Sequence, residues 1–165
     1  VIWTTWSRWS SAYPETCILT EDTGFSRRYG VDPYGQYNEK RGYYSSTRTL
    51  FEPLQGDSRA HPKAIVIGTR TEAGALAFDN ETLLRQRVLT GHIDDTPYVA
   101  VADTDLATGY VYANPESATV EVSDDGYTLD GTTHDADSLP LDRSLAFDAM
   151  WFAWAGFYPR SSYVD

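Results

Sequence analysis

Two apolar runs, Ala64-Ile65-Val66-Ile67 and Ala75-Leu76-Ala77-Phe78, decide the fold of this 165-residue chain. The first run is continuous and rich in β-branched residues, which is typical of a central strand buried on both faces. Turn-forming Glu72-Ala73-Gly74 lies between the two runs. We therefore expect the runs to pair as an antiparallel hairpin at the centre of a sheet.

Beyond this hairpin, strand signals recur roughly every ten residues, with turn residues between them. The predicted strands are residues 98–101, 110–112, 119–122 and 127–129. Such spacing predicts a mainly β fold (a β-rich α+β class), in which an antiparallel meander forms a sandwich or an open barrel. We also expect a short helix over 81–88, capped by Asp79 or Asn80, and a closing helix around 146–157.

The two ends of the chain carry the same pattern, W-x-x-W-x-x-x-Y-P, which begins at Trp6 and again at Trp151. Two tryptophans three residues apart lie on one helical face, and the proline ends the helix. The pattern therefore predicts a short Trp-containing helix near each end. It also predicts an internal repeat, in which residues 1–19 are the tail of a preceding repeat and residues 20–165 are a single β-rich domain.

The charge excludes some classes of partner. The chain has 24 acidic and 13 basic residues, a formal net charge of −11, and only two lysines. This excess of carboxylates argues against binding to nucleic acid or to an anionic membrane. It favours a halophilic, salt-adapted protein, with an ordinary acidic protein as the alternative. No run is long enough to span a bilayer, and the single cysteine, Cys17, lies in an apolar run where we expect a buried structural thiol.

The segment 20–62 is rich in Gly, Tyr, Ser and Arg and lacks periodicity, so we predict a long loop. Guanidinium and phenol groups in one loop can bind a carboxylate, a sulfate or a sugar. The alternative is a loop that only covers the sheet. The candidate ligand-binding residues are Asp22, Arg27, Arg28, Tyr29, Tyr34, Tyr37 and His61.

Aspartates in the predicted turns could hold a hard cation. Asp103 and Asp105 are weak candidates for a structural divalent cation, although their spacing is not that of an EF-hand loop. Solvated surface carboxylates are the alternative, and no other cofactor is evident. Further acidic residues follow in the same region: Asp124, Asp125, Asp130, Asp135 and Asp137.

Three segments resemble the domain of unknown function 3179 family: Asp22-Thr-Gly-Phe-Ser-Arg-Arg-Tyr-Gly30, His61-Pro-Lys-Ala-Ile-Val-Ile-Gly68 and Phe147-Asp-Ala-Met-Trp-Phe-Ala-Trp-Ala-Gly-Phe-Tyr-Pro159. The resemblance implies a bacterial or archaeal protein, commonly exported or lipid-anchored, in a family without established activity. It also implies that this chain is the C-terminal part of a longer member whose upstream half is missing.

Three hypotheses about function remain open. The chain is an extracytoplasmic binding or structural module, a hydrolase acting on an extracellular polymer, or a cation-stabilised carrier or redox protein. The first is favoured, because no residue pattern identifies a catalytic site. A protein partner, or the missing upstream half, would complete it, and the oligomeric state is left open.

Overall fold

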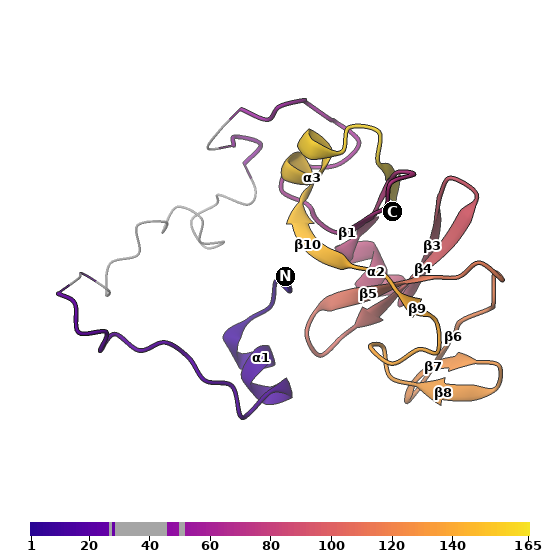
Figure 1. Cartoon of the computed structure of the whole chain (residues 1–165), viewed down its shortest axis with the longest axis horizontal. Helices are drawn as coiled ribbons and strands as arrows, with labels where there is room; N and C mark the ends of the chain where they lie inside the picture. Colours follow the sequence, from indigo (N-terminus) through magenta and orange to yellow (C-terminus); the bar gives the residue numbers. More distant parts are fainter. Residues whose placement is uncertain (27, 29–45, 50–51) are drawn as a thin grey trace.

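A computed structural model describes residues 1–26, 28, 46–49 and 52–165. Its helices are α1 (Trp6–Ala12), α2 (Asn80–Gln86) and α3 (Trp151–Phe157). Its strands are β1 (Ile65–Arg70), β2 (Ala75–Asp79), β3 (Val88–Ile93), β4 (Thr96–Asp103), β5 (Thr108–Ala113), β6 (Glu121–Ser123), β7 (Gly126–Leu129), β8 (Thr132–His134), β9 (Asp142–Arg143), β10 (Ala146–Met150) and β11 (Ser162–Val164). Figure 1 shows their arrangement.

The predicted hairpin is confirmed as the centre of the first sheet, which has the strand order β10-β1-β2-β11. β1 and β2 pair antiparallel, with Ile67 opposite Phe78. β10 pairs antiparallel with the other edge of β1. β11 joins β2 in parallel, which the predicted antiparallel meander did not include.

The second sheet (β3-β4-β5-β9) packs on the first, and the third (β6-β7-β8) packs on the second. Ile67, Leu76 and Phe78 of the first sheet form one core with residues of the second. Val99 and Val101 point to the opposite face of β4 and contact Tyr127 of the third sheet. The fold is therefore the predicted β-rich class. It is a sandwich, and among the described residues no sheet closes into a barrel.

Helix α2 is confirmed, and Asp79 is its cap, because its carboxylate accepts a hydrogen bond from Thr82 N at 2.8 Å. The helix ends earlier than predicted, since Arg87 has φ 72° and Val88 already opens β3. The closing helix is shorter than predicted too. Residues 146–150 form strand β10, because pairing with β1 outweighs their helical propensity.

Both W-x-x-W segments form the predicted helices, but they differ in burial. Trp151 and Trp154 of α3 are buried against β1 and β2, whereas no residue of α1 is buried. The predicted burial of Cys17 is wrong: the thiol is exposed, because residues 17–20 run over the surface outside any strand. The described parts of 20–62 contain no helix or strand, as predicted. Among the described residues, no helix has the length and hydropathy to cross a bilayer.

Candidate functional site

The loop residues predicted to bind a ligand are only partly described. Arg27, Tyr29, Tyr34 and Tyr37 lie outside the described residues. Asp22, Arg28 and His61 are exposed, and none of them lines the hollow described below. The Nδ1 atom of His61 accepts a hydrogen bond from Lys63 N at 3.2 Å, which is a local turn contact.

A polar corner that carries no signal in the sequence lies around Lys63. Lys63 is buried, its Nζ donates to the carbonyl of Ser46 at 2.7 Å, and burial lowers its pKa. Nearby, the Arg59 guanidinium pairs with Asp57 at 2.7 Å and lies 4.9 Å from the Trp151 ring centroid. These contacts join Ser46 to Lys63, and Asp57 and Arg59 to Trp151 of α3, and they explain the corner as structural.

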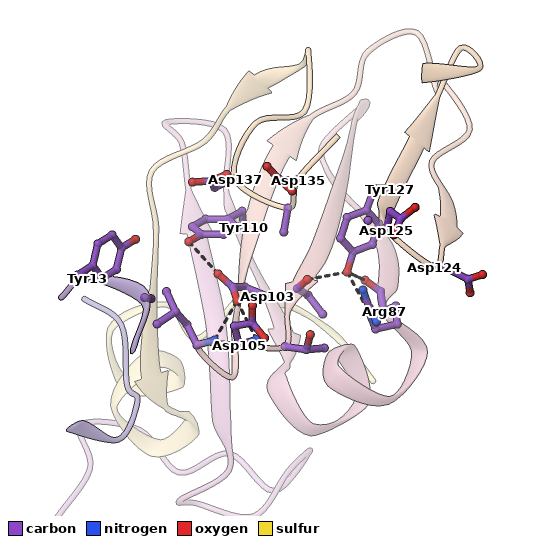
Figure 2. Close-up of a pocket in the computed structure, with 16 residues that line it drawn as sticks. Tyr13, Arg87, Asp103, Asp105, Tyr110, Asp124, Asp125, Tyr127, Asp135 and Asp137 are labelled. Carbon is purple, nitrogen blue, oxygen red and sulfur yellow. Dashed lines mark hydrogen bonds between the residues drawn. The ribbon is translucent and has the colours of Figure 1, made fainter. Parts of the chain in front are cut away.

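An acidic hollow of about 430 Å³ lies elsewhere, where α1, the β4–β5 turn, the β6–β7 turn and residues 135–137 meet. Figure 2 shows it with ten of its residues labelled. Its ionisable and phenolic residues are Tyr13, Arg87, Asp103, Asp105, Tyr110, Asp124, Asp125, Tyr127, Asp135 and Asp137. Among its described lining residues, six are aspartates and one is an arginine.

Asp103 organises the β4–β5 side of the acidic hollow. Its Oδ1 accepts from the backbone N–H groups of Asp105 (3.0 Å) and Leu106 (2.9 Å), which fixes the turn. Its Oδ2 accepts from the hydroxyl of Tyr110 at 3.2 Å. Burial, assisted by the Asp103 charge, raises the pKa of Tyr110. The phenol therefore remains a protonated donor at neutral pH.

Helix α1 completes this side of the acidic hollow. Arg8 Nη1 donates to the backbone carbonyls of Thr104 (2.6 Å) and Asp105 (2.8 Å) at the β4–β5 turn. This anchor places Tyr13, at the end of α1, on the rim (Figure 2). The Trp9 ring packs against the Tyr13 ring, with the two ring centroids 4.5 Å apart.

The opposite side is held by Tyr127. Its hydroxyl donates to the carbonyl of Ala102 at 2.6 Å and accepts from Arg87 Nε at 3.1 Å. Asp124 and Asp125 lie on the same side in the exposed β6–β7 turn (Figure 2). The Arg87 guanidinium is therefore held by its hydrogen bond to Tyr127, and it offsets only part of the negative charge of the acidic hollow.

The predicted cation ligands are brought together in part. Asp103 and Asp105 line the acidic hollow with four of the five other aspartates considered, and Asp130 does not. However, no three acidic, histidine or cysteine side chains of the described ranges converge closely enough to hold a metal ion. Both oxygens of Asp103 already accept hydrogen bonds. The divalent cation at Asp103 and Asp105 stays a prediction.

The fold and the hollow thus define a β-sandwich protein with an acidic surface site. The model of the family described as "Protein of unknown function (DUF3179)" matches residues 1–161. The chain belongs to this family, as its three motifs predicted. Comparisons with curated proteins and with solved structures found no match.

Proposed function

We propose that this chain is an extracytoplasmic binding module, and that the acidic hollow binds a cationic group of its ligand, an organic amine or a guanidinium. One observation carries the proposal: aspartates from separate turns converge on a concave surface that tyrosines border. The location outside the cytoplasm is supported by the acidic composition and by the family resemblance.

The chemistry of the lining favours an organic cation. Carboxylates attract positive charge, and a concave surface strengthens their combined field. The Tyr13 ring on the rim offers a π face, which attracts ammonium and guanidinium groups. Tyr110 already shows this behaviour within the chain, because the Arg143 guanidinium lies 4.3 Å from its ring centroid.

Salt adaptation alone also produces surface aspartates, and a matched charge change distinguishes the two explanations. Asp105→Asn removes a charge that lines the acidic hollow, whereas Asp130→Asn removes one that does not. Both residues are exposed. If the aspartates serve only salt adaptation, the two variants should respond to a cationic ligand alike. If the acidic hollow binds the ligand, only Asp105→Asn should respond less.

The test is a thermal-shift titration with putrescine and arginine methyl ester, with acetate as the anionic control. A ligand at a hundred times its Kd adds about 2.7 kcal/mol, which raises the unfolding midpoint by roughly 5–10 °C in a domain of this size. We expect the shift in the wild type and in Asp130→Asn, and a smaller shift in Asp105→Asn. An absent shift, or an equal loss in both variants, overturns the proposal.

The hydrolase and carrier hypotheses gain no support from the described residues. Burial raises the pKa of Asp148, which is a property that catalytic acids share. Its carboxylate, however, accepts from Thr108 Oγ1 at 2.9 Å and from Trp3 N at 2.6 Å, and it does not line the acidic hollow. Asp148 is therefore a structural acceptor in this arrangement.

A further inference from the structure

The two W-x-x-W segments have the same local structure in detail. The capping tyrosines, Tyr13 and Tyr158, have φ/ψ of −129°/73° and −125°/68°. Each ring lies 4.5 Å from that of the tryptophan four residues earlier. Each of these indoles donates to a hydroxyl seven residues on, Trp9 to Thr16 (3.0 Å) and Trp154 to Ser161 (2.8 Å). The two segments, which begin at Trp6 and Trp151 and are thus offset by 145 residues, are therefore also a structural repeat.

The surroundings of the two copies differ sharply. In the C-terminal copy Trp154 is 1% exposed and lies directly over Gly68 of β1. In the N-terminal copy Trp6, the equivalent of the fully buried Trp151, is 55% exposed. Helix α1 thus has the internal structure of a helix that covers a sheet, but no sheet of the described residues packs beneath it.

The residues before each helix match as well. Residues 1–5 correspond to β10, and the last residue of each segment is an extended N-cap, Thr5 with φ/ψ −84°/154° and Met150 with −74°/143°. Residues 1–3 also lie against the free edge of β10, because Asp148 N donates to the carbonyl of Val1 at 3.0 Å. Two equivalent segments are therefore neighbours.

This contact has a register that places equivalent residues opposite each other. From Val1 the chain runs toward α1, whereas β10 runs the opposite way toward α3 (Figure 1). In an antiparallel pair, the bond from Asp148 N to Val1 O places Ile2 opposite Phe147. Ile2 and Phe147 are themselves equivalent at the offset of 145. Trp3 N donates to the Asp148 carboxylate at 2.6 Å, so the contact brings equivalent residues opposite each other without symmetric bonding.

We propose that residues 1–5 and α1 close a preceding copy of this unit in the same polypeptide, and that the two sheets join edge to edge where residues 1–3 lie beside β10. The partner of α1 is then a sheet of the β10-β1-β2-β11 type. Its strand beneath Trp9 has a glycine where β1 has Gly68, because an indole at that position leaves no room for a Cβ.

Hydrogen exchange on the complete gene product and on residues 1–165, measured side by side, tests this arrangement. We expect the amides of 6–12 to exchange at least about tenfold more slowly in the gene product, approaching those of 151–157, because a packed helix opens less often. Equal exchange in the two proteins overturns the proposal. Protection of 6–12 in the 165-residue chain that grows with protein concentration also overturns it, in favour of a second copy as the partner.

Matched tryptophan variants give an independent readout. Trp9→Ala lowers the urea midpoint of the gene product but not that of the 165-residue chain, whereas Trp154→Ala lowers both. A Trp9→Ala gene product with an unchanged midpoint contradicts the proposal. The exchange experiment needs no substitution, so it decides the matter even where a variant fails to fold.

Discussion

Gly68 gives the sharpest test of how α3 packs on the first sheet. A Cβ added there would lie 2.3, 2.4 and 2.5 Å from three carbons of the Trp154 indole, whereas carbon atoms prefer about 3.5–4.0 Å. In Gly68→Ala the indole must therefore retreat by about 1 Å. That movement strains its hydrogen bond to Ser161 Oγ, which is 2.8 Å long.

The expected cost follows from these contacts. Overpacking a core costs about 1–3 kcal/mol, and a weakened hydrogen bond adds about 1 kcal/mol. Alanine recovers about 0.4–1 kcal/mol by restricting the unfolded chain. The free energy of unfolding should thus fall by about 1–3.6 kcal/mol, which corresponds to a fall in the thermal midpoint of about 2–14 °C. Urea unfolding followed by tryptophan fluorescence measures this change.

Gly56→Ala is the matched control, because nothing lies within 4 Å of its added Cβ. It should leave stability unchanged or raise it slightly. The double variant Gly68→Ala/Trp154→Phe should cost less than the two single losses combined, since the smaller ring makes room for the methyl group. A Gly68→Ala protein as stable as Gly56→Ala would refute the packing of Trp154 on β1.

Three other measurements test separate features. Burial raises the pKa of Asp148, so the folded state binds its proton more tightly and loses stability as pH rises above the ordinary value of 3.8. The thermal midpoint of Asp148→Asn should therefore rise relative to that of the wild type as pH increases. A difference between the two midpoints that stays constant with pH would count against this. Asp79 caps α2 through Thr82 N and accepts from the Tyr163 hydroxyl (3.1 Å), so Asp79→Ala should lose about 1–2 kcal/mol in urea unfolding, with Asp79→Asn as the milder control. If the acidic surface reflects salt adaptation, the unfolding midpoint should be higher in molar KCl than at low ionic strength, and equal midpoints would exclude it.

The sequence predicted those elements whose local signals agree with their tertiary contacts. The β1–β2 hairpin and the Asp79 cap follow directly from apolar runs and turn residues. Strand β10 was missed because Ala146–Met150 reads as helix until β1 is available to pair with it. Strand β11 was missed because three residues carry too little pattern, and only its parallel pairing with β2 defines it.

The candidate site was predictable in its residues but not in its assembly. The aspartates of the acidic hollow belong to turns, and isolated turn aspartates look like solvated surface. Asp103 and Asp137 lie more than thirty residues apart in the sequence, and only the stacking of the second and third sheets brings their segments together. Tyr13 had no sequence signal for this site beyond its place in the repeat.

Tyr13 links the two proposals physically. It lines the acidic hollow and its ring contacts that of Trp9, the residue that a preceding sheet would cover. Its equivalent, Tyr158, already has a guanidinium beside it, because Arg70 lies 5.8 Å from its ring centroid. The same tyrosine position thus lies beside a guanidinium from within the chain in one copy and borders a group of aspartates in the other. A sheet that fixes Trp9 would also fix the Tyr13 ring. Less conformational entropy would then be lost when a cation binds against that ring.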